Sequence, residues 1–181
     1  MDIKNSGKYI FLGGTRSGKS LLAENTIATG HSEICYVATA PRAWVMSDAD
    51  FAARVAGHQA RRGANWRTVE LDVPGDLYDL IENAEIPTLV DSVGGWVAHD
   101  IDFIPDFLRL ERAIRRCNVP LSFVAEEAGL SVHPQSAAVR RYVDLLGQAN
   151  QTIANCVDRV FFVAAGRVIE LFSLIFAGEV S

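Results

Sequence analysis

Residues 13–20 read Gly-Gly-Thr-Arg-Ser-Gly-Lys-Ser, and they constrain the fold more than any other segment of the chain. They match the pattern G-x-x-x-x-G-K-[ST], a glycine-rich loop between a strand and a helix whose backbone N–H groups surround phosphate oxygens. The flanking segments fit this arrangement, because the apolar run 9–12 predicts a strand and segment 19–29 carries apolar residues at helical spacing. The motif therefore predicts an α/β fold with a nucleotide phosphate site at the start of the first helix.

Short apolar runs recur along the chain and alternate with segments of helical spacing. This alternation predicts a mostly parallel sheet flanked by helices, that is, a P-loop (RecA-like) α/β fold in which the last two strands form a short antiparallel hairpin. Nothing in the composition marks a linker or a repeat, so we expect residues 1–181 to form one domain. The further strands are predicted at 34–38, 66–70, 88–91, 121–125, 160–165 and 168–172, and the further helices from the capping residues 47–50 toward 62 and at 75–84, 103–117 and 135–157.

Charge and composition limit the classes of partner. The chain has 17 basic and 22 acidic residues, a net charge of −5, which argues against broad binding of nucleic acid. No apolar run reaches the roughly 18 residues of a membrane span, and the polar segment 1–8 does not resemble a signal peptide. Cys35, Cys117 and Cys156 form no CxxC pair. We therefore expect no nucleic-acid partner, no membrane span, no disulfide framework and a cytoplasmic location.

The residues of the motif and of the strand ends suggest individual roles. Lys19 can reach the β- and γ-phosphates, and the Ser20 hydroxyl can bind Mg²⁺. A second Mg²⁺ ligand is expected at the end of a neighbouring strand, where Asp91 is the best candidate and Glu126 and Glu127 compete with it. Because successive residues of a strand point in opposite directions, we expect only one of the two glutamates to face the phosphates.

His58 lies among arginines in a chain that has four histidines in all. An imidazole can attack the α-phosphate of a nucleotide, expelling pyrophosphate and leaving a phosphoramidate, and the guanidinium groups of Arg61 and Arg62 would stabilise the charge on that phosphate. Spacing alone fits a solvated helix face better. Three interpretations therefore stay open at this point: nucleotidyl transfer through His58, phosphoryl transfer by a small-molecule kinase, and a non-catalytic nucleotide-binding module.

A series of segments, in order, carries a resemblance to one family: 13–20, Tyr-Val-Ala-Thr-Ala at 36–40, Ala-Arg-Val-Ala-Gly-His at 53–58, Trp-Arg-Thr-Val-Glu at 66–70, Leu-Val-Asp-Ser at 89–92, Glu-Ala-Gly at 127–129 and the stretch 141–151. Together they resemble the bifunctional adenosylcobinamide kinase / adenosylcobinamide-phosphate guanylyltransferase family of cobalamin biosynthesis. The likeness extends from about Tyr9 to Gly166, and its histidine segment is more specific than the phosphate loop.

The resemblance implies two reactions on small-molecule substrates. Adenosylcobinamide is phosphorylated at the expense of ATP or GTP, and GMP is then transferred from GTP to adenosylcobinamide phosphate through a guanylylated histidine, giving adenosylcobinamide-GDP and pyrophosphate. By this resemblance His58 holds the histidine position and the assembly is a homotrimer; the phosphate loop itself gives Lys19 as the second catalytic residue and Ser20 and Asp91 as the Mg²⁺ ligands. The implied nucleotide contacts are Gly13, Gly14, Thr15, Arg16, Ser17, Gly18, Lys19, Ser20, Thr39, Ala40, Pro41, Gln59, Ala60, Arg61, Arg62, Glu70 and Asp91.

Two departures from the family pattern concern the first of these reactions. Segment 91–96 lacks the Leu-Thr that often follows the acid at the strand end, and Glu126 stands where Asn is common. They leave open a guanylyltransferase that has lost the kinase step.

Overall fold

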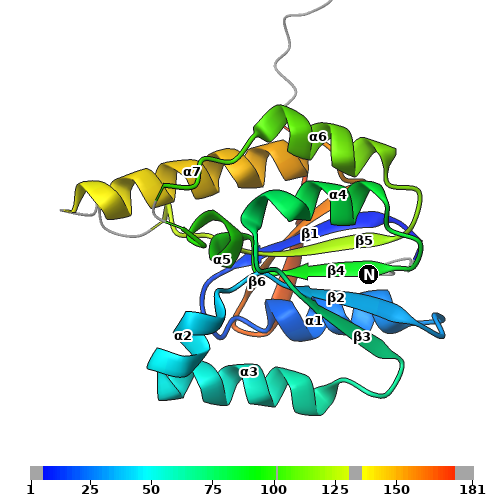
Figure 1. Ribbon diagram of the computed structural model, residues 1–181. Coiled ribbons are helices and arrows are strands. Elements are labelled where there is room, and N and C mark those ends of the chain that lie inside the picture. Colours follow the sequence, from blue (N-terminus) through cyan, green and yellow to red (C-terminus); the bar gives the residue numbers. More distant parts are fainter. Residues whose placement is uncertain (1–5, 101, 131–135, 174–181) are drawn as a thin grey trace, which may run out of the picture.

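The computed structural model describes residues 6–100, 102–130 and 136–173, in which seven strands form one sheet of order β3-β2-β4-β5-β1-β6-β7 (Figure 1). Neighbouring strands pair in parallel except β6 and β7, which are antiparallel. The predicted α/β class and C-terminal hairpin are thus confirmed. The strands are β1 (Lys8–Gly13), β2 (Ile34–Ala38), β3 (Trp66–Glu70), β4 (Thr88–Asp91), β5 (Leu121–Glu126), β6 (Arg159–Ala164) and β7 (Arg167–Leu171).

The helices connect these strands and cover both faces of the sheet (Figure 1). Every helix that the sequence predicts from helical spacing is present, and the observed helix ends differ from the predicted ends by a few residues. The helix expected from 103 begins only at Phe107, because Asp106 caps it by accepting a hydrogen bond from the backbone N–H of Arg109. The helices are α1 (Lys19–Ala28), α2 (Arg42–Ser47), α3 (Ala49–Arg61), the 3₁₀ turn η1 (Pro74–Asp76), α4 (Leu77–Glu82), α5 (Val93–Val97), α6 (Phe107–Arg116) and α7 (Ala137–Ala154).

Two short helices, α2 and α5, were not expected from the sequence. They have six and five residues, too few for a helical period to be recognised. In addition, α5 contains Gly94 and Gly95, and glycine is a poor helix former. Its first turn is stabilised by Ser92, whose side chain accepts a hydrogen bond from the backbone N–H of Gly95.

The core has one part on each face of the sheet. The larger part joins the sheet to α4, α5, α6 and α7, with Trp96, Leu110 and Phe123 fully buried in it. The smaller part joins the other face to α1 through Ile27 and Phe11. Because β1, β2, β4 and β5 are parallel, their carboxyl ends meet at one edge, where binding sites form in sheets of this kind.

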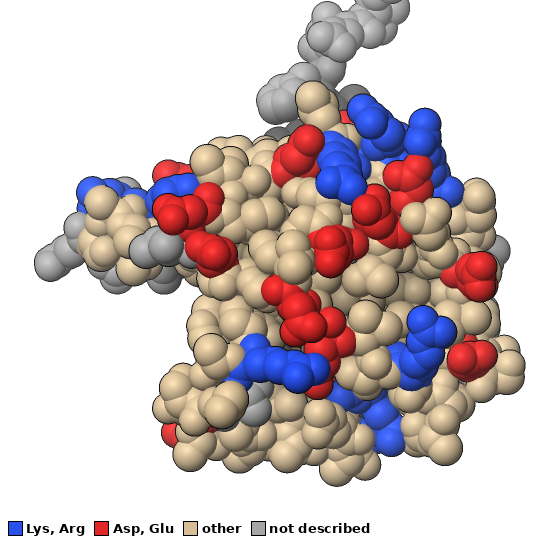
Figure 2. All heavy atoms as spheres, viewed as in Figure 1, with Lys and Arg blue, Asp and Glu red and all other residues tan. Residues whose placement is uncertain are grey.

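The outer surfaces of α4 and α6 carry charges of both signs next to each other, as Figure 2 shows. Arg109 pairs with Asp79 and Arg116 with Glu82, each at 2.7 Å. The basic side chains of this face are therefore offset by neighbouring acids. In the described part of the chain, every helix is too short or too polar to cross a lipid bilayer.

Candidate active site

A cavity of about 1010 Å³ opens at the carboxyl edge of the sheet. The phosphate loop forms one wall, α2 and α3 form a second, and α5 together with Tyr142 of α7 closes the opposite side. Figure 2 shows the molecule hollowed between α7 and α2. This cavity is large enough for a nucleotide, and the residues that face into it decide what chemistry it supports.

The phosphate loop is held in shape by two of its glycines. Gly18 has φ of +98° immediately before α1, a conformation that glycine adopts without strain. Gly13 lies so close to the backbone of Val163 in β6 that any side chain there would overlap its carbonyl oxygen. Lys19 is buried, and its ammonium group donates to the carbonyl oxygen of Gly14 at 3.2 Å. The loop therefore presents backbone N–H groups and one buried cation at the start of a helix, which suits a polyphosphate.

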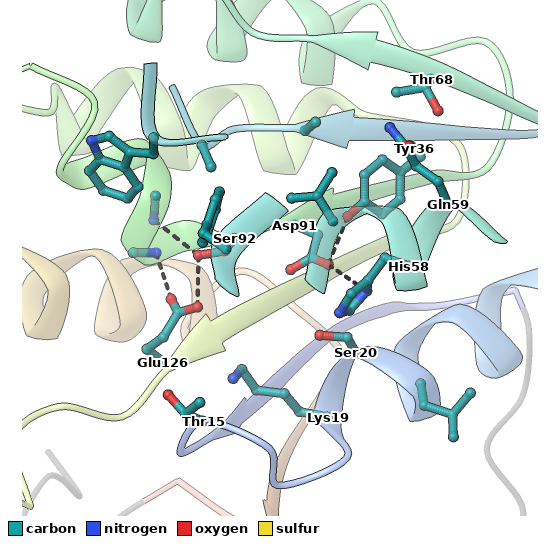
Figure 3. A pocket seen from close by; sticks show the side chains of 18 of the residues that line it. Thr15, Lys19, Ser20, Tyr36, His58, Gln59, Thr68, Asp91, Ser92 and Glu126 are labelled. Carbon is teal, nitrogen blue, oxygen red and sulfur yellow. Dashed lines mark hydrogen bonds and ion pairs between the residues drawn. The ribbon is translucent and has the colours of Figure 1, made fainter. Parts of the chain in front are cut away.

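His58, in the last turn of α3, faces the phosphate loop across the cavity (Figure 3). Its Nδ1 lies 3.1 Å from Oε1 of Glu24 and 3.9 Å from Oδ2 of Asp91. Tyr36 donates its hydroxyl hydrogen to the same Asp91 oxygen at 2.9 Å. The structure thus brings the imidazole and the phosphate loop to one cavity within one chain.

The two carboxyl groups beside His58 have shifted pKa values of opposite sign. Burial raises the pKa of Asp91, and the charges of Glu126 and Glu24 raise it further, which outweighs the opposing effects of His58 and Tyr36. Burial also acts to raise the pKa of Glu24, but the hydrogen bonds and charges of His58 and Arg61 prevail, and the net pKa is lowered. Glu24 is therefore the firmly ionised member of the pair.

Two arginines at the end of α3 lie beside this group. Arg61 contacts both carboxylate oxygens of Glu24, at 3.2 and 3.3 Å. The guanidinium of Arg62 stacks on the ring of Tyr36, 3.5 Å from its centre, and its Nη1 is buried with no hydrogen-bond partner among the described residues. A phosphate oxygen would supply the acceptor that this nitrogen lacks.

Glu126 ends β5 on the opposite side of the cavity and is held by α5 (Figure 3). Its carboxylate accepts hydrogen bonds from the Ser92 hydroxyl at 2.7 Å and from the backbone N–H of Gly94 at 2.9 Å. Glu127 does not face the cavity; it accepts a hydrogen bond from the backbone N–H of Gly129 at 3.0 Å. Only one of these two glutamates therefore lines the cavity, and its carboxylate is turned toward Ser92 and α5.

Most of the residues expected to contact nucleotide line this cavity, and five do not. Thr39 is fully buried, accepts a hydrogen bond from the backbone N–H of Ser92 at 2.7 Å and donates to the Ser92 carbonyl, so it shapes the loop after β4. Glu70 forms an ion pair with Arg42. The expected residues that line the cavity are Thr15, Arg16, Ser17, Gly18, Lys19, Ser20, Ala40, His58, Gln59, Arg61, Arg62, Glu70 and Asp91, and those that do not are Gly13, Gly14, Thr39, Pro41 and Ala60.

Several residues of the site were not expected from the sequence. Glu24 is one of them, although a signal existed, because it follows Ser20 by four residues and so lies on the same face of α1. Tyr36 and Arg42 are others, for which no local pattern existed. Two other histidines follow predicted strands and were candidates for the site. His99 contacts the carbonyl oxygen of Leu71 at 2.9 Å and does not line the cavity, and His133 lies outside the described residues.

The oxygen donors of the cavity fit a magnesium ion. Ser20 and Asp91 both face into it, and Mg²⁺ prefers hydroxyl and carboxylate oxygens. A cation would also favour the ionised form of Asp91, whose pKa is raised in the protein alone. Ligand atoms of Glu24, His58 and Asp91 lie within 4.8 Å of one another, but Glu24 already has Arg61 as its cationic partner.

Comparison with known proteins adds an independent observation. A family model described as "Cobinamide kinase / cobinamide phosphate guanyltransferase" matches residues 9–171. The bifunctional adenosylcobalamin biosynthesis protein CobP of Pseudomonas aeruginosa is 37% identical over 166 residues, covering 87% of this chain and 92% of that protein. The corresponding CobU of Salmonella typhimurium is 30% identical over 177 residues, covering 85% and 93%.

Among solved structures, the chain is similar to the flagellar accessory protein FlaH from Methanocaldococcus jannaschii, with a TM-score of 0.50. The superposition covers 91% of this chain and 75% of the FlaH chain. The two sequences are 11% identical, so this likeness concerns the fold alone, and it agrees with the predicted RecA-like arrangement.

Proposed function

Because the chain belongs to the cobinamide kinase / cobinamide phosphate guanyltransferase family, a family of bifunctional enzymes of adenosylcobalamin biosynthesis, we propose that both reactions use the cavity described above and that His58 carries GMP in the second. Family membership sets aside the non-catalytic module and the plain small-molecule kinase. The departures from the family pattern at 91–96 and Glu126 therefore give no reason to assume that the kinase step has been lost.

One observation above all supports the role of His58. Its imidazole and the phosphate loop line the same cavity, and 28% of the His58 side chain is exposed. In the proposed step, a ring nitrogen attacks the α-phosphorus of GTP, the nitrogen–phosphorus bond forms, and pyrophosphate leaves with the electron pair of the broken P–O bond. A phosphate oxygen of adenosylcobinamide phosphate then attacks the same phosphorus and releases the imidazole.

The surrounding cations stabilise these steps. Lys19 and the backbone N–H groups of 13–20 bind the β- and γ-phosphates. Arg62, whose Nη1 has no hydrogen-bond partner in the described part of the chain, is available to the α-phosphate. Ser20 and Asp91 would hold Mg²⁺, which when bound offsets the charge of the triphosphate. In the kinase step, the same loop would hold ATP or GTP while the aminopropanol hydroxyl of adenosylcobinamide attacks the γ-phosphate.

The test is to incubate the protein with GTP labelled on the α-phosphate and to recover the protein. We expect label that is stable in alkali and lost in acid, as a phosphoramidate is. The label should be absent from His58→Ala and present in His31→Ala, a loop histidine that does not line the cavity. Label retained by His58→Ala would remove this residue from its role.

Three further features of the proposal concern the molecule as a whole. We expect residues 1–181 to behave as one domain, the protein to assemble as a homotrimer, and the enzyme to work in the cytoplasm on small-molecule substrates rather than on nucleic acid. Light scattering measures the assembly, and a mass equal to one chain would contradict the trimer.

A further inference from the structure

Among the residues that the structure describes, Glu24 is the acid that contacts the proposed nucleophile without lining the cavity. It lies in α1, its side chain is 5% exposed, and it is not among the residues that line the cavity. Its Oε1 nevertheless lies 3.1 Å from Nδ1 of His58, which is in α3. A residue in this place acts on the reaction through the groups that it holds, the imidazole of His58 and the guanidinium of Arg61.

We propose that Glu24 is a positioning residue that accepts a hydrogen bond from Nδ1–H of His58 and thereby leaves Nε2 as the nitrogen that attacks GTP. This inference rests on the proposed guanylyl transfer and deepens it by assigning the reacting atom.

The neighbours of Nδ1 determine which nitrogen carries the proton. Oxygens of Glu24 and Asp91 lie 3.1 and 3.9 Å away, and the ionised carboxylate of Glu24 can only accept a hydrogen bond. Nη2 of Arg61 lies 3.0 Å from Nδ1, but Arg61 has other acceptors: the carboxylate of Glu24 and the carbonyl oxygen of Gly57. An unprotonated Nδ1 would face the ionised carboxylate of Glu24 with its lone pair, whereas a protonated Nδ1 donates to Glu24 and leaves Arg61 paired with its other acceptors.

The charge of Glu24 also matches the change in the ring during the reaction. When Nε2 forms its bond to phosphorus, the ring keeps its proton on Nδ1 and becomes positively charged. The carboxylate of Glu24, whose pKa is lowered at this site, stays ionised and stabilises that cation. When the acceptor later takes the guanylyl group, the ring returns to its neutral form with the proton still on Nδ1.

The experiment measures the initial rate of protein labelling by α-labelled GTP in variants of the full chain. We expect Glu24→Ala to label on the order of 10²-fold more slowly, or slower still, without a rise in the KM for GTP, because Glu24 orients and stabilises the imidazole and does not line the cavity. Glu24→Gln keeps an acceptor oxygen and should recover at least about tenfold over Glu24→Ala. Glu111→Ala, which removes a partly exposed acid of α6, is the matched control and should label at the wild-type rate.

The site of attachment gives a second readout, taken on the wild-type protein. Periodate oxidation followed by β-elimination removes the guanosine and leaves a phosphohistidine, whose two isomers are separated after alkaline digestion. We expect the isomer phosphorylated on Nε2. Phosphorylation on Nδ1, or a Glu24→Ala rate within about twofold of wild type, would overturn the proposal. Absence of label from the wild-type protein would instead refute the guanylyl transfer through His58, so the two failures are distinguishable.

Discussion

Asp91 is a carboxyl group that the folded protein stabilises poorly in its ionised form. It ends β4 with 10% of its side chain exposed, and burial raises its pKa, as do the charges of Glu126 and Glu24. A group whose pKa is raised by folding adds to stability at pH values below its unfolded pKa and loses that contribution as the pH rises through the folded value. We therefore attribute this residue to the proposed binding of a cation, which would compensate its charge, and not to the stability of the free protein.

We predict that Asp91→Asn raises the melting temperature of the protein at pH 7.5 without nucleotide or divalent ions. The amide can still accept the hydrogen bond from Tyr36 but has no charge to desolvate. Each kcal/mol gained should raise the melting temperature by about 2–4 °C in a protein of this size. The gain should shrink in acid, where wild-type Asp91 is itself protonated.

Melting curves of both proteins between pH 4 and 8 check this expectation, with Asp144→Asn, at an exposed position of α7, as the control. A melting temperature of Asp91→Asn below that of wild type at pH 7.5 would show that the ionised carboxylate stabilises the free protein.

At the scale of single elements, the junction of β1 with the phosphate loop depends on close packing against β6. We predict that Gly13→Ala costs about 1–3 kcal/mol of unfolding free energy, because a Cβ would overlap the carbonyl oxygen of Val163 and the backbone would have to move. Gly14→Ala is the matched control, since its Cβ would have no atom within 4 Å and should change stability by less than about 0.5 kcal/mol. Denaturant unfolding without nucleotide measures both, and equal values would contradict the packing argument.

The start of α5 offers a second test at this scale. Ser92 accepts a hydrogen bond from the backbone N–H of Gly95 and donates one to Glu126, so Ser92→Ala removes a helix cap and one support of a carboxylate. We predict a loss of about 1–2 kcal/mol. Ser136 precedes α7 without making a side-chain cap hydrogen bond, and Ser136→Ala should therefore leave the unfolding free energy nearly unchanged. A loss of the same size in both variants would mean that the cap at Ser92 contributes nothing specific.

These elements also show what the sequence could predict. The strands and long helices followed from periodicity, and the phosphate loop from its motif, because both signals are local. The helices α2 and α5 are too short to show a period. Tyr36 and Asp91 are 55 residues apart in the chain, and only the pairing of β2 with β4 brings them together. The position of Glu24 on the Ser20 face of α1 could have been predicted, but its contact with His58 depends on where α3 lies in the fold.

For the molecule as a whole, the proposed function assigns nucleotide binding and guanylyl transfer to different residues of one cavity, so the two should be separable. We predict that Mg²⁺ with α,β-methylene GTP, which cannot release pyrophosphate, stabilises wild-type protein by about 2.7 kcal/mol at a concentration 100 times its Kd. Lys19→Ala should lose this stabilisation, because it removes the buried cation of the phosphate loop. His58→Ala should keep it, because the imidazole acts on phosphorus and adds little to ground-state binding.

Thermal unfolding of the three proteins with and without the analogue measures this linkage. The ligand would join α1, the ends of β4 and β5, and α3, so its effect on unfolding reports whether these parts close around one triphosphate. If His58→Ala also lost the stabilisation, the imidazole would be a binding group, and loss of label in that variant would no longer identify a nucleophile. Retained stabilisation together with lost labelling requires that His58 act after the nucleotide has bound, which is the behaviour of a group that forms a covalent intermediate.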